Sequence, residues 1–392
     1  MNAEPARPWL VLLGLALGMC VTNAFARFAY GLMLPAMKAE MGWNYAQAGW
    51  LNTANAIGYI LGALLTTGLI GRIGAPRLFS FGLITTAISL LATGLLDALW
   101  WQTLWRIAAG LFGAMSFSSS GALAAQLFAT DARRNALAIG LLFGFGGGLG
   151  ILLAGAVLPL MLEYFGNGAW PQGWILIGLT SFAFLPLSLW AARQLNGPPP
   201  ENHTAARPGL RPILAQMTGY GAFGLGYFVY FTFLSVWMTE RQFSAGMIAT
   251  VWVLLGLCLC VSPFVWRPVF ARFRSGVPLA LILTGIAVGT ALPVLWPGPM
   301  GLMLSAAAFG LSVFMSPSAV TSFVRHNLPM HSWGTAISLF TVVFAVTQTI
   351  GPYAAGWLGD LTDDLGISLL SASAVLLGGA VVASQQKPLP RG

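Results

Sequence analysis

Two arginines, Arg27 and Arg106, lie inside long apolar stretches of this chain. A guanidinium in a bilayer-spanning segment is costly unless it faces protein or water, so each arginine is a candidate functional residue. The apolar stretches hold no aspartate, glutamate or histidine. The three histidines, His203, His326 and His331, fall in polar loops. Unpaired positive charges in a low-dielectric cavity should attract an anion, whereas a proton relay at membrane depth has no titratable carboxylate or imidazole to use.

Polar side chains that can accompany these arginines share faces of the predicted helices. At about 100° per residue, Asn23, Arg27 and Tyr30 lie at about 0°, 40° and −20°, which is one narrow stripe. Two further groups share a face in the same way, namely Asn52, Asn55 and Tyr59, and Gln216, Tyr220, Tyr227 and Tyr230. We predict a central site of cation, amide and phenol donors, with the substrate-binding residues Arg27, Asn23, Tyr30, Asn55, Arg106, Tyr220 and Tyr227.

The same residues also have structural interpretations, which the sequence leaves open. Arg27 can hold backbone carbonyls or a neighbouring helix instead of a substrate, and Arg106, which is nearer the end of its span, can organise helix packing. Asn55 can form an interhelical hydrogen bond, which is worth ~0.6 kcal/mol on average in membrane proteins. The tyrosines can be packing residues that bury their rings.

The elements that must position these residues are membrane-spanning helices. Of the 392 residues, 57% are hydrophobic, only 7% are charged and 48 are glycine. A bilayer crossing needs ~20 predominantly apolar residues at ~1.5 Å per residue. Apolar segments of that length are centred near residues 22, 58, 88, 114, 149, 184, 225, 255, 287, 312, 344 and 376. We therefore predict an all-α membrane protein with twelve transmembrane helices.

The distribution of charge predicts the orientation of these helices. If the N-terminus is inside, the outer loops hold only Lys38 and Arg241 among the basic residues, and fourteen of the eighteen fall in inner segments, where short basic loops remain. Both termini are then cytoplasmic. Basic residues of the inner loops are candidate members of an inner gate, and those we single out are Arg72, Arg133 and Arg272.

A polar interruption divides the chain into two sets of six helices. Residues 196–212 contain a glycine followed by three prolines and several charges, which predicts a cytoplasmic linker between an N-terminal bundle (1–195) and a C-terminal bundle (213–392). Shifting the second half back by 200 residues lays span on span, so that Phe28 meets Phe228 and Gly110 meets Gly310. The matching order of spans and loops predicts duplicated halves.

Two six-helix halves in one orientation, joined by a polar linker, resemble the major facilitator superfamily over the whole chain. Within it, the segments 26–31 (ARFAYG), 34–37 (LPAM), 45–49 (YAQAG) and 51–55 (LNTAN) are similar to the YbfB/YjiJ group. The resemblance implies the major facilitator fold and transport by rocking of the halves. It does not specify a substrate.

Three superfamily motifs appear in altered form. The loop Gly71–Arg77 has Gly71 where the superfamily usually has an aspartate, which argues against a charge-relay gate there. Residues Arg106–Gly110 are similar to the arginine-to-glycine motif of many proton-coupled members. The glycine-rich fifth span lacks the Gly-Pro element associated with drug antiporters, which argues against drug efflux.

We therefore predict a secondary active transporter of a small organic anion or zwitterion, with protons as a candidate coupling ion, in the plasma (inner) membrane. The alternatives are an exporter of amphipathic metabolites or drugs and, from another class, a transport-inactive membrane sensor or assembly partner. We expect no enzyme activity, cofactor, metal or nucleic-acid partner, since no nucleotide-binding loop occurs and Cys20, Cys258 and Cys260 lie in apolar spans. The lipid bilayer is the expected surrounding, and a monomer is the expected functional unit.

Overall fold

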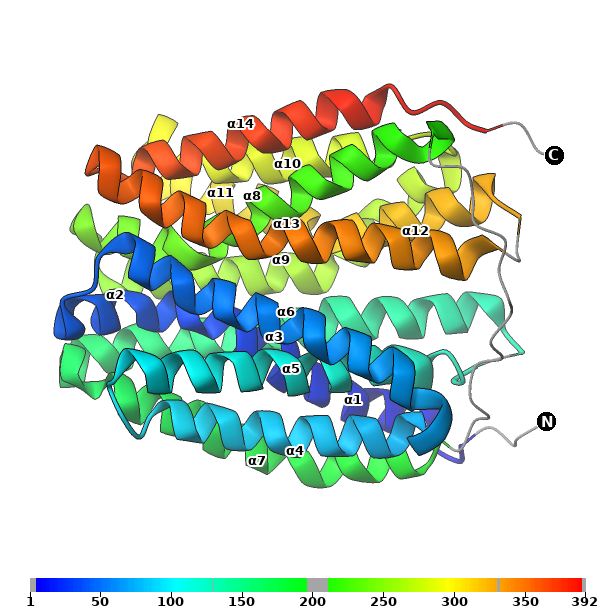
Figure 1. The fold of residues 1–392 in the computed structure, drawn as a ribbon, viewed down its shortest axis with the longest axis horizontal. Helices are drawn as coiled ribbons and strands as arrows, with labels where there is room; N and C mark the ends of the chain where they lie inside the picture. Colours follow the sequence, from blue (N-terminus) through cyan, green and yellow to red (C-terminus); the bar gives the residue numbers. More distant parts are fainter. Residues whose placement is uncertain (1–4, 129, 196–210, 330–331, 390–392) are drawn as a thin grey trace.

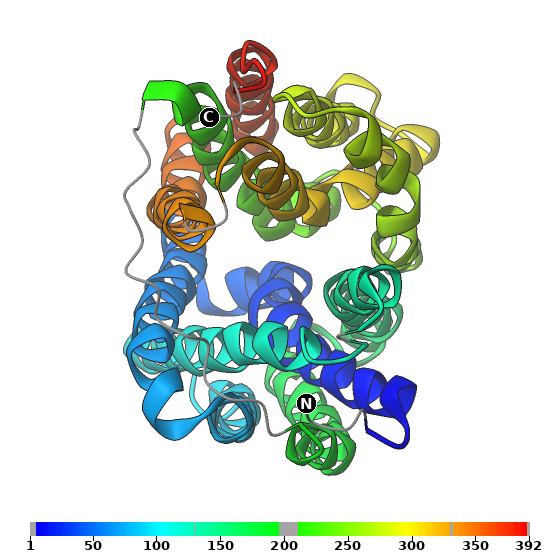
Figure 2. The ribbon, with the colours of Figure 1, turned by 90° about the vertical axis from the view of Figure 1, so that its right-hand side faces the viewer.

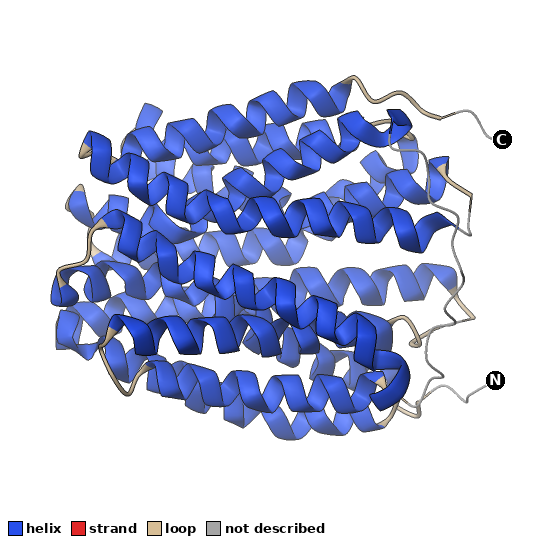
Figure 3. Cartoon of the chain, viewed as in Figure 1, coloured by secondary structure: helices blue, strands red, loops and turns tan. Residues whose placement is uncertain are grey.

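The computed structural model describes residues 5–128, 130–195, 211–329 and 332–389. The regular secondary structure of this part of the chain is all helical, with loops between the helices and without strands (Figure 3). It contains twelve helical segments that are long and apolar enough to cross a membrane, which confirms the predicted all-α fold. The predicted linker at 196–212 lies outside the described residues, apart from Arg211 and Pro212, which begin a short 3₁₀ turn.

The first six spans use residues 8–193. The first is one helix whose middle part has π geometry, and the sixth is preceded by a 3₁₀ turn. Their elements are α1 (Pro8–Met19), η1 (Cys20–Phe28), α2 (Ala29–Met41), α3 (Tyr45–Ile73), α4 (Ala75–Thr93), α5 (Leu99–Ala124), α6 (Ala132–Phe165), η2 (Asn167–Ala169) and α7 (Trp170–Arg193).

The last six spans use residues 211–384. A 3₁₀ turn interrupts the fourth of them just before a Ser-Pro step, where proline is compatible with the first turn of a new helix. Their elements are η3 (Arg211–Ile213), α8 (Leu214–Glu240), α9 (Ala245–Arg272), α10 (Val277–Leu295), α11 (Pro299–Ser312), η4 (Val313–Met315), α12 (Ser316–Asn327), α13 (Trp333–Thr362) and α14 (Leu365–Ser384).

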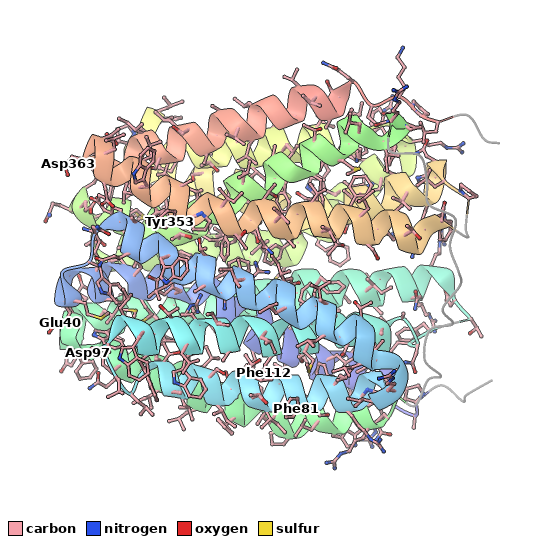
Figure 4. All side chains as sticks on the ribbon, in the orientation of Figure 1. Glu40, Phe81, Asp97, Phe112, Tyr353 and Asp363 are labelled. Atoms are coloured by element: carbon pink, nitrogen blue, oxygen red, sulfur yellow. The ribbon has the colours of Figure 1, made fainter. Side chains whose placement is uncertain are left out.

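Both termini lie at the same end of the bundle, on the right of Figure 1. We call this the terminal end and the opposite one the far end. Figure 2, which looks at the terminal end, shows the first six spans below and the last six above. The two sets meet where α3 packs against α13, α6 against α9 and α2 against α8. The acids Glu40, Asp97 and Asp363 lie at the far end (Figure 4).

Close helix packing repeats at the 200-residue shift expected from the sequence. A side chain at Gly110 would collide with the backbone carbonyl of Asn55, and a Cβ at Gly310 would lie 2.7 Å from the carbonyl of Leu255. The two contacts therefore join positions that differ by 200 on both sides. Only glycine permits such an approach, so the same small-residue packing holds the helices together within each set of spans.

The far end carries polar contacts between the two sets of spans. Asp360 in the last turn of α13 accepts hydrogen bonds from the backbone N–H groups of Tyr45 (2.7 Å) and Ala46 (2.8 Å), which begin α3. The Tyr45 hydroxyl donates to Glu240 at 2.6 Å, and Lys38 lies 3.5 Å from the same carboxylate. A carboxylate on exposed N–H groups and on the positive end of a helix is a stable arrangement. We call these contacts the far-end latch.

Candidate functional site

Arg27 lies in the π-helical segment η1, in the middle of the first span. Arg27 is only 4% exposed. A π-helix shifts backbone hydrogen bonds to i→i+5, as the Ala29 N–H to Ala24 carbonyl bond shows. Segments of this kind are frequent at functional sites. The irregular turn places the Arg27 side chain between the two sets of spans.

Two neutral side chains from the other half hold the Arg27 guanidinium. Its Nη2 donates to the Tyr227 hydroxyl at 3.0 Å and to Oε1 of Gln348 at 2.6 Å. The Tyr227 hydroxyl in turn donates to the same Gln348 oxygen at 3.0 Å. We call Arg27, Tyr227 and Gln348 the central triad. It joins η1 to α8 and α13 near the middle of all three spans.

Aromatic rings surround the central guanidinium. The Arg27 Cζ atom lies 4.3 Å from the ring centre of Tyr59, 5.1 Å from that of Phe228 and 5.6 Å from that of Phe28. Such rings attract a cation weakly through their faces, by about 2 kcal/mol when the contact is desolvated. They exclude water without neutralising the charge, so the site keeps its positive charge.

The central triad has more donors than acceptors. Nε of Arg27 and Nε2 of Gln348 are buried and have no hydrogen-bond partner within the described residues. The ion pairs seen in this part of the chain are Lys38–Glu240, Arg134–Asp131 and Arg241–Asp364, so no carboxylate pairs with Arg27. A buried unpaired donor is unfavourable, and a buried cation more so. The geometry therefore suits an incoming acceptor with negative charge.

Arg106, the second buried arginine, has a different environment. Its Nη1 donates to the carbonyl of Ala26 at 2.7 Å, and its Nη2 donates to Oδ1 of Asn52 at 2.9 Å. Asn55 donates from Nδ2 to the same Ala26 carbonyl at 3.2 Å and to the Arg106 carbonyl at 3.0 Å. Arg106 and Asn55 thus hold the backbone of η1, whose carbonyls are displaced from the α-helical pattern. Their contacts match the structural interpretation of these two residues.

The structure separates the three residues expected on one stripe of the first span. Tyr30 donates from its hydroxyl to the Ala48 carbonyl at 2.9 Å, so it bonds within its own half. Asn23 is 7% exposed and lies near Gly147 of α6, and its side chain has no hydrogen bond within the described residues. Arg27 points to the other half. The expected stripe assumed 100° per residue, and η1 does not keep that period.

Tyr220 and Tyr227 of α8 share an aromatic face with α13. Their ring centres lie 5.4 Å and 5.7 Å from that of Phe344, and Phe223 lies between them in the same stack. Tyr227 belongs to the central triad, whereas the Tyr220 hydroxyl has no hydrogen bond within the described residues. Tyr220 lies about two turns from the triad toward the terminal end.

The three arginines predicted to form an inner gate lie near the terminal end. Arg72 lies in the last turn of α3, Arg133 lies in the first turn of α6 and Arg272 ends α9, and each is exposed. None takes part in an ion pair within the described residues, and Arg272 lies over the Phe273 ring at 5.6 Å. Their gating role stays a prediction.

Sequence reasoning missed Gln348 as a site residue. The available signal was an amide in the middle of an apolar span, and the structure shows this side chain fully buried. The contact of Asn52 with the other half was also not predicted, because its helix face alone does not identify a partner. Asn52 donates to Thr232 of the other half at 2.6 Å, and Thr53 donates to the Thr349 carbonyl at 2.7 Å.

Comparison with known proteins places the chain among transporters. It is 23% identical over 380 residues to "Probable anion transporter 3, chloroplastic" of Arabidopsis thaliana. That match covers 89% of this chain and 69% of the relative. It is 26% identical to "Monocarboxylate transporter 11" of Homo sapiens over 66% of this chain and 58% of that protein. A relative from Haemophilus influenzae is 29% identical over 44% of this chain. That match spans 40% of the relative, so two of these three relatives are covered over less than two thirds of their length.

Solved structures and a family model agree on the fold. A mutant of the nucleoside transporter NupG superimposes with a TM-score of 0.72 at 12% identity, covering 95% of this chain and 98% of that one. A bacterial homolog of the human lysosomal transporter Spinster, inward-facing and unoccupied, gives 0.65 at 14% identity, covering 98% and 96%. The family model described as "Uncharacterised MFS-type transporter YbfB" matches residues 15–384, so the chain belongs to this MFS_4 family of multi-pass membrane transporters.

Proposed function

We propose that this protein is a secondary transporter of a small organic anion and that Arg27 binds the anionic group. The observation that carries the proposal is the central triad, a buried guanidinium held only by neutral oxygens, in which Nε of Arg27 and Nε2 of the neighbouring Gln348 are unpaired within the described residues. A carboxylate accepts hydrogen bonds on two oxygens and supplies the missing negative charge. The names of the anion and monocarboxylate relatives favour the same class of substrate.

Alternating access is the transport mechanism that fits the contacts between the two sets of spans. Hydrogen bonds between them include the far-end latch, the central triad at mid-depth, and the bonds of Asn52 to Thr232 and of Thr53 to the Thr349 carbonyl. With the termini in the cytoplasm, as the basic loops predict, this arrangement closes the outer side of a plasma (inner) membrane carrier. The domains 1–195 and 213–392 then rock about the central site, and one chain suffices as a monomer.

The aromatic stack favours a second candidate function. Tyr220, Phe223 and Phe344 form a stacked surface beside the central triad, which suits export of an amphipathic metabolite. In that case the aromatic surface dominates recognition and Arg27 has a structural role. The charge of the bound compound separates this candidate from an anion carrier.

A thermal-shift screen of the detergent-purified protein tests the proposed function. The panel contains acetate, lactate, pyruvate, benzoate, succinate and citrate, together with the neutral amides lactamide and benzamide and several amphipathic amines. A ligand that binds only the folded protein stabilises it by ~2.7 kcal/mol at one hundred times its dissociation constant. We expect acids to raise the melting temperature and matched amides not to do so.

Two variants make the screen specific. Arg27→Gln should lose the stabilisation by acids, whereas Arg193→Gln removes one exposed positive charge in the last turn of α7 and should keep it. If no acid in the panel stabilises the protein, or if Arg27→Gln responds like the wild type, the anion proposal is wrong. Stabilisation by amines or neutral amphiphiles that persists in Arg27→Gln would favour the exporter.

A further inference from the structure

The Gln348 amide has an unusual hydrogen-bond pattern inside the central triad. Its Oε1 accepts from both Arg27 and Tyr227, while its Nε2 has no partner in the described part of the chain. The side chain is fully buried. The two donors that face it fix the orientation of the amide, because the reversed amide would point Nε2 at a guanidinium. One amide atom is thus used twice and the other not at all.

The Gln348 oxygen lies where an oxygen of a bound carboxylate would accept a hydrogen bond from the Arg27 N–H group. The distance of 2.6 Å between Nη2 and Oε1 is short for a bond to a neutral acceptor. A carboxylate is a stronger acceptor than an amide carbonyl, so it can displace the amide from the guanidinium. The released amide can then turn its free Nε2 toward the second oxygen of the anion.

Resting on the proposed function, we infer that Gln348 is the residue that sets the charge of the substrate. Its amide substitutes for the anion while no substrate is bound, and its neutrality leaves the charge of Arg27 uncompensated. Arg106 directs its Nη1 and Nη2 to the Ala26 carbonyl and to Asn52 of its own half, so it presents neither of them to the anion. The matching substrate is a monocarboxylate rather than a dicarboxylate or tricarboxylate.

The same exchange connects substrate binding to the contact between the two sets of spans. Arg27 belongs to η1, and both of its hydrogen-bond partners belong to α8 and α13. An anion that binds the guanidinium breaks the direct hydrogen bond between Arg27 and Gln348 across the interface. Gln348 is therefore a specificity-determining residue. It also forms the hydrogen bond with Arg27 that the bound anion replaces.

Two substitutions at one position test this inference. Gln348→Glu places a permanent carboxylate against Arg27, so it should weaken binding of the stabilising monocarboxylate by roughly 10- to 100-fold. It should also raise the melting temperature of the empty protein, because the buried cation gains a charged partner. Gln348→Leu removes the amide but keeps the positive charge, so it should weaken monocarboxylate binding less than Gln348→Glu does. Gln126→Glu, after the end of α5, adds the same charge elsewhere and should leave affinity unchanged.

The outcomes separate this inference from the proposed function. Binding titrations use the acid of the panel with the largest shift on the wild type, and succinate and citrate as the multiply charged probes. If no acid binds the wild type, the anion proposal fails and this inference fails with it. If an acid binds and Gln348→Glu keeps wild-type affinity, or if succinate or citrate binds more tightly than every monocarboxylate, only the assignment of Gln348 is wrong.

Discussion

Arg27 and Arg106 are two buried arginines of one half, and the structure uses them in opposite ways. Arg106 donates to a backbone carbonyl of η1 and to Asn52, both in its own half. Arg27 donates only to side chains of the other half, Tyr227 and Gln348. Both guanidiniums lack a carboxylate within the described residues. Burial alone therefore does not distinguish them, whereas the origin of their partners does.

The difference shows which cation is free to exchange its partners. A carbonyl of η1 that lost Arg106 would be a poorly satisfied acceptor in an apolar surrounding, so that bond is fixed by the fold. Tyr227 and Gln348 bond to each other as well as to Arg27, so they remain paired when Arg27 turns to another acceptor. We interpret Arg106 as the support of the irregular helix and Arg27 as the binding group.

The largest effect is expected when the supporting arginine is removed. Arg106→Gln should destabilise the protein by about 2–3 kcal/mol, because it deprives Asn52 and the Ala26 carbonyl of a charged donor. Thermal unfolding in detergent measures the loss. Arg27→Gln is the matched variant and should unfold close to the wild-type temperature. Equal losses in both variants would erase the distinction between the two arginines.

A charge-conserving change at the binding arginine should have the next largest effect. Arg27→Lys keeps a positive charge but has no planar fork of donors for a carboxylate. We expect the stabilising monocarboxylate to bind roughly tenfold more weakly, which corresponds to ~1.4 kcal/mol. Titration of the melting temperature with the acid gives the affinity. Wild-type affinity in this variant would show that charge alone, without paired hydrogen bonds, holds the anion.

The far-end latch offers a cross-half contact of a third kind, in which side-chain oxygens bind backbone donors. Asp360→Asn leaves one oxygen for the two N–H groups that begin α3 and removes the charge at the helix N-terminus. This change should weaken the latch by ~1 kcal/mol. Spin labels at the exposed positions Trp100 and Gln242 should report a larger share of long distances across the far end. An unchanged distance distribution would show that the latch does not hold the halves.

The smallest effect is expected for the hydrogen bond between Asn52 and Thr232. Thr232→Val keeps the shape of the side chain and removes the acceptor at 2.6 Å. Interhelical bonds of this kind contribute ~0.6 kcal/mol on average, so the melting temperature should fall slightly. The affinity for the acid should not change, because neither residue contacts Arg27. A loss of anion binding in this variant would extend the site beyond the central triad.

Much of the fold could be predicted because it follows from composition and spacing. Apolar length alone locates the twelve spans, and the positions of Arg27 near the middle of its span and of Arg106 nearer the end of its span follow once the spans are placed. The 200-residue shift aligns Phe28 with Phe228 as equivalent positions of the two halves; that their rings also touch, with centres 5.8 Å apart, is a contact that the alignment did not predict. The features that could be predicted depend on one segment at a time or on the regular order of segments.

The partners of the arginines could not be predicted in the same way. Gln348 is 321 residues from Arg27 along the chain, and their contact depends on how the two sets of spans pack together. The π geometry of η1 also has no simple sequence signal, yet it decides that Arg27 and Tyr30 point to different neighbours. Periodicity assigns residues to faces only where the helix keeps the assumed period.

Uptake of a radiolabelled acid into liposomes that contain the purified protein tests the central claim most directly. The substrate is the monocarboxylate that stabilises the wild type most, and the compared proteins are the wild type, Arg27→Gln and Arg193→Gln. We expect uptake by the wild type and by Arg193→Gln, and only the background of empty liposomes with Arg27→Gln. Uptake by Arg27→Gln at the wild-type rate, with saturation at the same concentration, would contradict the assignment of Arg27 as the binding group.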